Sequence, residues 1–137
     1  MLFAEREFSG DFAELMDSLL FHLKNSGYVA VADIDVKGIL KRTMNLDFKE
    51  YHIFEICKPQ AAKDLVGEDD NNGLFLPCKM VAFESEGKVR VRILLSSELT
   101  EKFNLGTPDR IKKYENELIG LFNSFVPRPA KDSLRAL

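Results

Sequence analysis

Two cysteines mark the part of this 137-residue chain that is best suited to chemistry. One ends the alternating stretch "YHIFEIC", and the other opens the stretch "CKMVAF". Each cysteine has a proline within two positions and a lysine directly after it. The candidate ligand or thiol site therefore comprises six residues: Cys57, Lys58, Pro59, Pro77, Cys78 and Lys79.

The reactive form of cysteine is the thiolate, which positive charge and a helix N-terminus both favour. Pro59 is a typical first residue of a helix, so the amides after Lys58 are expected to point back towards Cys57. If the strands at Cys57 and Cys78 are neighbours, the two sulfurs form a dithiol pair, or one reactive thiol with a resolving partner. The competing interpretation is that both are small buried residues, as free cysteines often are. The sequence has no CxxC spacing and favours the buried interpretation.

The sequence predicts no metal and no cofactor. Structural zinc needs four ligands, usually Cys, His or carboxylate. The histidines are His22 and His52, and His52 lies an odd number of residues before Cys57 in one strand, so those two side chains point to opposite faces. The loop "EDDNNG" has Glu68, Asp70 and Asn72 at alternate positions, as a calcium-binding loop does. An EF-hand loop that began at Glu68 would need a bidentate glutamate at its twelfth position, where this chain has Lys79.

Two further charge patterns have ordinary structural explanations. Lys88, Arg90 and Arg92 alternate with apolar residues, which is typical of a solvent-facing strand in a sheet covered on one side. The alternative is that they bind an anionic ligand. Asp33 and Asp35 form a pair of carboxylates, but Asp35 is explained as the N-cap of a short helix. No acid–base pair or nucleophile motif stands out.

Hydrophobic periodicity predicts the elements that position these residues. Strands are expected at residues 2–8, 28–34, 49–57, 78–84 and 88–95. Helices are expected directly after Ser9, Asp35, Lys58 and Thr107. The resulting order βαβαβαββα, with a closing hairpin and short single-striped helices, favours an α+β fold in which the helices cover one sheet face.

Length and composition fit one domain at residues 1–126 and a C-terminal tail at residues 127–137. The net charge of -3 gives no footprint for nucleic acid. No stretch approaches the roughly 18 apolar residues of a membrane span, and the start "MLFAEREFSG" lacks a signal-peptide core. We therefore expect a cytoplasmic protein that binds neither nucleic acid nor membrane and keeps its cysteines as thiols.

Several stretches, in order, resemble the family called domain of unknown function 302. They are "SGDF", "GYVAVADIDV", "LKRTMNLDFKEYHIFEICKP" and "GLFLPCKMVAFESEGKVRV", and the likeness runs from about Phe8 to Leu95. Its most recognisable points are the Cys-x-Pro after the third strand and the Pro-Cys that opens the fourth. The family usually has a small residue before the first cysteine and Asn after it, where this chain has Ile56 and Lys58. The resemblance implies a TBP-like fold with a curved antiparallel sheet and frequent homodimers, and it implies no established activity.

The sequence thus predicts a small binding or assembly domain without catalysis of its own, because the fold pattern is complete while catalytic motifs are missing. The alternative is a thiol-dependent redox or sulfur-handling protein that acts through Cys57 and Cys78. A small anionic or thiol compound is the expected kind of ligand. The open sheet face and the aromatic-rich final helix, which ends at Phe122 and Phe125, predict a symmetric homodimer.

Overall fold

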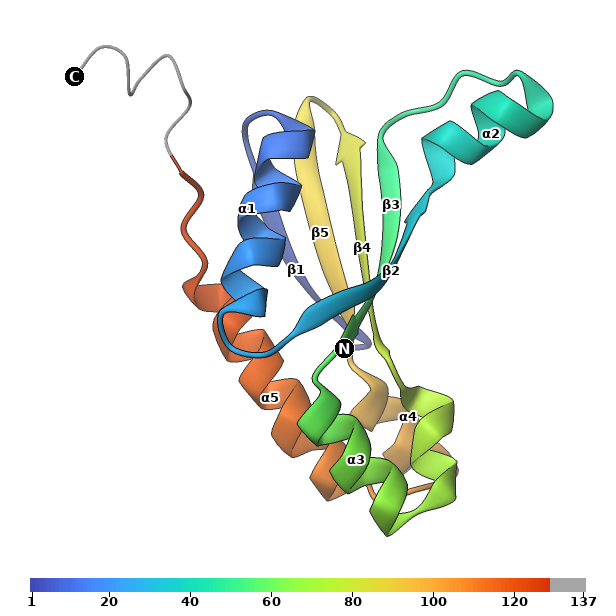
Figure 1. Cartoon of the computed structure of the whole chain (residues 1–137), viewed down its shortest axis with the longest axis vertical. Helices are drawn as coiled ribbons and strands as arrows, with labels where there is room; N and C mark the ends of the chain where they lie inside the picture. Colours follow the sequence, from blue (N-terminus) through green and yellow to red (C-terminus); the bar gives the residue numbers. More distant parts are fainter. Residues whose placement is uncertain (129–137) are drawn as a thin grey trace.

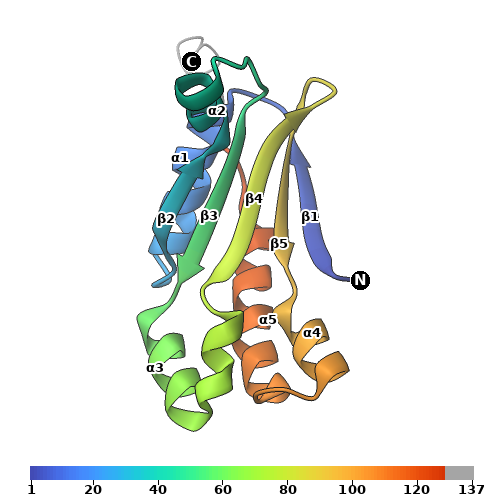
Figure 2. The same cartoon turned by 90° about the vertical axis from the view of Figure 1, so that its right-hand side faces the viewer.

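The structure, a computed structural model, describes residues 1–128 of the chain. Its centre is one antiparallel sheet with the strand order β1-β5-β4-β3-β2 (Figures 1 and 2). The strands are β1 (Phe3–Phe8), β2 (Val29–Asp35), β3 (Tyr51–Cys57), β4 (Cys78–Ser85) and β5 (Lys88–Leu94). The turn between β4 and β5 has φ values of 54° at Glu86 and 77° at Gly87. This is the hairpin that the sequence predicts there.

The helices fall into three groups around this sheet. They are α1 (Phe12–Lys24), α2 (Val36–Met44), α3 (Pro59–Glu68), the 3-10 helix η1 (Asp70–Phe75), α4 (Ser96–Phe103) and α5 (Pro108–Ser124). Helices α1 and α5 cover one face of the sheet (Figure 2). Helices α3, η1 and α4 gather beyond the end of the sheet at which β3 finishes, and α2 projects from the opposite end (Figure 1). The second sheet face carries no helix among residues 1–128.

The hydrophobic core lies between the covered sheet face and helices α1 and α5. Along β5, Val89, Val91 and Ile93 are buried and alternate with charged residues on the open face. Helix α1 contributes the stripe that includes Leu19 and Leu23, as its 3.6-residue spacing predicts. Burying one such side chain contributes about 1.5–3 kcal/mol. The two-residue period of β5 and the 3.6-residue period of α1 therefore determine which face of each element is buried in the core.

The predicted α+β class, the five-stranded antiparallel sheet and the order βαβαβαββα are confirmed. Asp35 caps α2 through a 2.9 Å hydrogen bond from a backbone amide, also as predicted. The prediction for α1 is wrong by two residues. Its N-cap is Asp11, which accepts from the Glu14 amide at 3.0 Å. Ser9 instead accepts a hydrogen bond at 2.6 Å from Nζ of Lys88, the first residue of β5.

Three features of the shape differ from the prediction. The sheet is twisted without being strongly curled, so a TBP-like saddle is not confirmed (Figure 2). Only α1 and α5 lie over the sheet, whereas α2, α3 and α4 lie past its ends (Figure 1). Helix α4 and the 3-10 helix η1 occupy segments that have no predicted helix.

The aromatic end of α5 belongs to the core of the chain. Phe122 is 0% exposed and Phe125 is 3% exposed. Arg6 on β1 holds this helix end, donating to the carbonyl of Phe122 at 2.8 Å and to that of Phe125 at 2.6 Å. A cation at a helix C-terminus satisfies carbonyls that have no partner within the helix. These two phenylalanines therefore give no surface for a second subunit, contrary to the role the sequence suggests for them.

Of the predicted tail at residues 127–137, residues 129–137 lie outside the described residues. No helix within residues 1–128 is long and apolar enough to cross a membrane.

Candidate functional site

The six residues predicted as a ligand or thiol site lie where β3 runs into α3 and where β4 begins after η1. Cys78 pairs with Ile56 across these two strands, so Cys57 is one position away from the residue opposite Cys78. Both cysteines are free thiols of intermediate burial. Cys57, Lys58 and Cys78 line one small cavity, while the other three residues, Pro59, Pro77 and Lys79, do not line it.

The cavity beside the cysteines is too small for an organic ligand. Its volume is about 20 Å³, which is close to the space that a single water needs. Its wall also includes Tyr28, Tyr114 and Glu115. Glu115 already accepts two hydrogen bonds from Ser97, one from the amide at 3.0 Å and one from the hydroxyl at 2.6 Å. The cavity is thus a packing feature of this end of the domain.

The surroundings of Cys78 disfavour its thiolate. Burial raises the pKa of the Cys78 thiol to about 11, and the negative charges of Glu115 and Cys57 act in the same direction. The two lysines next to the cysteines do not offset this, because each is paired elsewhere. Lys58 forms an ion pair with Glu117, and Lys79 lies 2.7 Å from Glu55. Cys78 is therefore protonated at neutral pH.

A larger cleft lies at the other end of the sheet, between α1 and strands β2, β3 and β4. Its volume is about 270 Å³. Five carboxylates line it: Asp11, Asp17, Asp33, Glu50 and Glu84. The apolar part of its lining is formed by Phe12, Met16, Leu20 and Phe54. No lysine or arginine lines this cleft, and His52 is its one other titratable residue. We refer to it as the acidic cleft.

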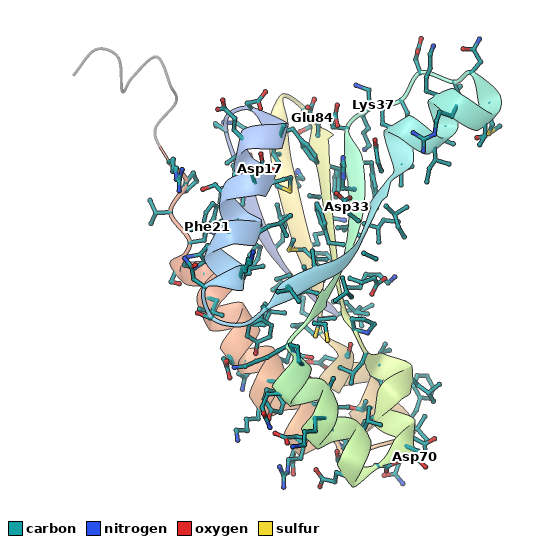
Figure 3. All side chains as sticks on the ribbon, viewed as in Figure 1. Asp17, Phe21, Asp33, Lys37, Asp70 and Glu84 are labelled. Carbon is teal, nitrogen blue, oxygen red and sulfur yellow. The ribbon has the colours of Figure 1, made fainter. Side chains whose placement is uncertain are left out.

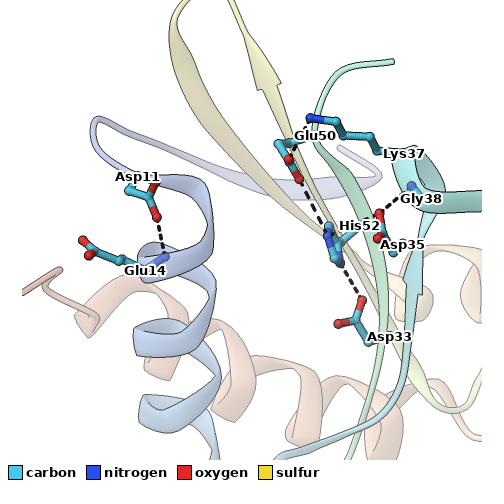
Figure 4. A network of polar contacts seen from close by, with 8 residues as sticks. All are labelled: Asp11, Glu14, Asp33, Asp35, Lys37, Gly38, Glu50 and His52. Atoms are coloured by element: carbon cyan, nitrogen blue, oxygen red, sulfur yellow. Dashed lines mark hydrogen bonds and ion pairs between the residues drawn. The ribbon is translucent and has the colours of Figure 1, made fainter. Parts of the chain in front are cut away.

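His52 is held in one orientation on the wall of the acidic cleft (Figure 4). Its Nδ1 lies 2.6 Å from Oδ1 of Asp33, and its Nε2 lies 3.7 Å from Asp35 and 4.0 Å from Glu50. Its ring stacks on Phe54 with the ring centroids 5.6 Å apart. The neighbouring carboxylates and the stacked ring of Phe54 together fix the orientation of the imidazole.

Two carboxylates of the acidic cleft form no hydrogen bond or salt bridge within residues 1–128, although the charge of Glu84 helps to raise the pKa of the nearby Lys37. Glu50 pairs with Lys37 at 3.1 Å, Asp11 caps α1, and Asp33 holds the histidine. Within residues 1–128, the carboxylates of Asp17 and Glu84 form no hydrogen bond or salt bridge. Figure 3 shows Asp17 on α1 and Glu84 near the upper end of β4, and both residues line the same cleft. The cleft therefore keeps negative charge that the chain itself does not neutralise.

The sequence alone does not reveal this cleft. It identifies Asp33 and Asp35 as a carboxylate pair and considers His52 only as a zinc ligand. The register of β2 against β3 brings them together, because Asp35 lies opposite His52 and Asp33 lies opposite Phe54. Alternation places the residues on one face, but it does not say which strands are neighbours. Among residues 1–128, no group of three or more His, Cys, Asp or Glu side chains has the geometry to hold a metal ion.

Comparisons with known proteins agree with the resemblance seen in the sequence. The model of the family described as "Domain of unknown function DUF302" matches residues 4–125. A crystal structure of the uncharacterized conserved protein DUF302 from Bacillus stearothermophilus is similar with a TM-score of 0.80 and 24% identity. That match covers 90% of this chain and 97% of the other chain. No curated protein matches the chain significantly. Because the family model spans most of the sequence, the chain belongs to the DUF302 family of unknown function.

Proposed function

We propose that this protein is a small binding domain without catalysis of its own, and that its acidic cleft binds a small organic cation with an apolar part. One observation carries the proposal: five carboxylates and no lysine or arginine line a cleft of about 270 Å³ that has an aromatic wall. A pocket of about 300 Å³ or more is typical of small-molecule sites, so this cleft suits a small ligand.

The charge of the cleft decides the sign of the ligand. Within residues 1–128, Asp17 and Glu84 are the lining carboxylates that form no hydrogen bond or salt bridge, and each would gain a charge-assisted hydrogen bond from an ammonium group. A small anion, the ligand class suggested by the sequence, would instead meet the like charge of five carboxylates. The rings of Phe12 and Phe54 are 7% and 1% exposed and both lie against the imidazole of His52, so they close the base of the cleft and the carboxylates determine the ligand's charge. A primary ammonium carried on an apolar group fits both parts of the lining.

The alternative is thiol-dependent redox or sulfur chemistry at Cys57 and Cys78, and it has less support. The cavity beside these cysteines holds about 20 Å³. The raised pKa of Cys78, about 11, keeps that sulfur in its unreactive form at neutral pH. A binding role in the acidic cleft needs neither thiol.

The test uses three compounds of nearly equal shape and different charge. Benzylammonium, benzyl alcohol and benzoate are titrated into isotopically labelled protein at low salt, and amide chemical shifts are followed. We expect benzylammonium to bind, with shifts clustered at the cleft residues of α1, β2 and β3. Benzoate should not bind there, because no cation lines the cleft. Equal binding of benzoate and benzylammonium, or shifts located away from the cleft, would overturn the proposal.

A variant and a matched control locate the effect. The double substitution Asp17→Asn with Glu84→Gln removes two carboxylate charges and leaves the size of each side chain nearly unchanged. Each exposed charge contributes on the order of 1 kcal/mol, so the loss of two should lower the affinity for benzylammonium by about thirtyfold. Asp70→Asn, on η1 at the far end of the molecule (Figure 3), removes one negative charge, as each substitution of the pair does, and should leave the affinity nearly unchanged.

A further inference from the structure

Strand β2 forms an uncovered edge of the sheet. It pairs with β3 on one side, and among residues 1–128 no other strand runs along its outer side (Figure 2). In the same range, no hydrogen bond from a helix, a turn or a side chain reaches the backbone of residues 29–34. Val31 is 58% exposed and Ile34 is 38% exposed. An exposed edge strand of this kind keeps N–H and C=O groups that another chain can pair with.

The devices that usually protect an edge strand are few in β2. Natural edge strands commonly carry lysine, proline or a bulge. The sequence of β2, "VAVADID", has neither lysine nor proline. The register against β3 shifts between Ala30 and Ala32, and residues 32–35 then pair with β3 without interruption. This regular stretch is therefore the part of the edge that can accept a further strand.

The two faces of this edge differ in charge. Asp33 lies opposite the buried Phe54 and Asp35 lies opposite His52, so both aspartates are on the face that meets the acidic cleft (Figure 4). Each carboxylate is about half exposed, and Asp33 itself lines the cleft. Ile34 points to the opposite, open face of the sheet, as alternation requires. The edge of β2 is thus acidic on the cleft face and apolar on the open face.

We infer that β2 accepts an extended segment of a partner protein as an added strand, in which lysine alternates with apolar residues. The lysines face Asp33, Asp35 and the acidic cleft, and the apolar side chains lie beside Ile34. Neighbouring strands are about 4.8 Å apart, which the side chain of lysine spans. Main-chain pairing at a sheet edge, with alternate side chains giving specificity, is a general mode of peptide recognition. A lysine side chain is an ammonium on an apolar stem, so the inference rests on the proposed function and names the source of its ligand.

The charges disfavour a second copy of this chain at the same edge. If two β2 strands paired with each other in antiparallel fashion, Asp33 and Asp35 of both strands would lie on one face of the joined sheet. Like charges on neighbouring strands are destabilising. A segment that carries lysine at alternate positions brings the opposite charge to these aspartates, and it therefore fits the edge better than β2 itself does.

The test uses a synthetic peptide and the isotopically labelled full chain. The peptide has eight residues in which lysine and valine alternate, and both of its ends are blocked, so that only the lysines carry charge. Amide chemical shifts and hydrogen exchange are followed during the titration. We expect slower exchange at amides of β2, because outward N–H groups gain partners, together with shifts at the cleft. The same peptide with glutamate in place of lysine should bind at least about tenfold more weakly, because its carboxylates would face Asp33 and Asp35.

Two N-methylated isomers of the peptide distinguish strand addition from the binding of charge alone. A strand pairs through alternate residues on each of its two edges. Methylating the lysine amides blocks one edge, and methylating the valine amides blocks the other, while charge and composition stay the same. One isomer should bind like the unmodified peptide, and the other should bind at least about tenfold more weakly because several backbone hydrogen bonds are lost. Equal affinity of the two isomers, or equal binding of the glutamate peptide, would overturn the inference.

A lysine placed on the edge itself gives a variant with a matched control. Ile34→Lys puts positive charge beside the added strand and removes an apolar contact, so the affinity for the lysine peptide should fall about fivefold. Leu2→Lys makes the same change of charge at an exposed position just before β1, at the other edge of the sheet, and should leave the affinity within about twofold. The amide spectrum establishes that each variant is folded. If Ile34→Lys unfolds the chain, Val31→Lys replaces it. Equal losses at the two edges would contradict binding at β2.

Benzylammonium separates this inference from the proposed function. Binding of benzylammonium without slower exchange at β2 in the presence of the peptide rejects only the added strand. Slower exchange at β2 with discrimination between the isomers, but no binding of benzylammonium, rejects only the site for small free cations. Protection of β2 amides that increases with the concentration of the protein alone would show that a second copy occupies the edge, and it would also overturn the inference.

Discussion

The imidazole of His52 is tied to Asp33 across the edge of the sheet, with Nδ1 lying 2.6 Å from Oδ1. Asp33 belongs to the edge strand β2, and His52 belongs to the adjacent strand β3. The contact is diagonal, because the residue directly opposite His52 is Asp35. It therefore does two things at once. It fastens the edge strand, and it holds the histidine ring against Phe54 on the wall of the acidic cleft.

Removing the charge from this contact should loosen the edge of the sheet. We expect Asp33→Asn to lower the free energy of unfolding by about 1 kcal/mol, because the bond is charge-assisted but the carboxylate is half exposed. Urea denaturation measures the change. The exposed Asp70→Asn, which has the same chemistry without a side-chain partner, should stay within about 0.5 kcal/mol of the parent. Equal effects of the two substitutions would show that the bond to His52 contributes nothing to stability.

The parts of the fold that could be predicted are those specified by local pattern. The strand alternation in β5, the stripe of α1 and the cap at Asp35 each involve residues close in sequence. Helix α4 could not be predicted in this way, because it has no side-chain cap of its own and its N-terminus is satisfied by Glu115, eighteen residues beyond Ser97. The same holds for the acidic cleft. Its residues come from α1, β2, β3 and β4, and only the strand order brings them together.

The carboxylate of Glu115 should be the main stabiliser of helix α4. It is 7% exposed and accepts from both the amide and the hydroxyl of Ser97, so it acts as an N-cap supplied by another helix. We expect Glu115→Ala to cost about 3 kcal/mol of unfolding free energy, because a buried amide and hydroxyl lose their acceptor. Glu115→Gln keeps one acceptor oxygen and should cost less, about 1–2 kcal/mol.

Ser97→Ala is the matched control for that pair, because it removes the hydroxyl and leaves the bond from the amide. It should cost about 1 kcal/mol. Chemical denaturation ranks the three variants, and hydrogen exchange at the Ser97 amide reports the helix end directly. If Ser97→Ala costs as much as Glu115→Ala, the hydroxyl and not the capping carboxylate carries the stabilisation.

The buried thiol of Cys78 should make the domain lose stability in alkaline solution. Burial raises its pKa from 9.0 to about 11, so the folded chain holds this proton more tightly than the unfolded chain does. As pH rises from about 9 to about 11, the unfolded state loses the proton first, and the free energy of unfolding falls by roughly 2–3 kcal/mol over that window. Below about pH 9 the contribution is constant, because the thiol is protonated in both states.

The measurement compares urea unfolding at several pH values for the parent and for Cys78→Ala. The substitution lowers stability at neutral pH through lost packing, but the informative quantity is the slope against pH. The buried Tyr28, whose pKa is raised mainly by burial and in part by the charge of Cys78, adds to the decline in both proteins and adds less in the variant. The variant should show a shallower decline between pH 9 and 11. Native-state labelling of Cys78 by a thiol reagent should likewise be slow at neutral pH and accelerate in that window, since the thiolate is the reacting species. Fast labelling of Cys78 at neutral pH, together with equal slopes for the two proteins, would contradict a buried protonated thiol and would restore the Cys57–Cys78 pair as the place to look for redox chemistry.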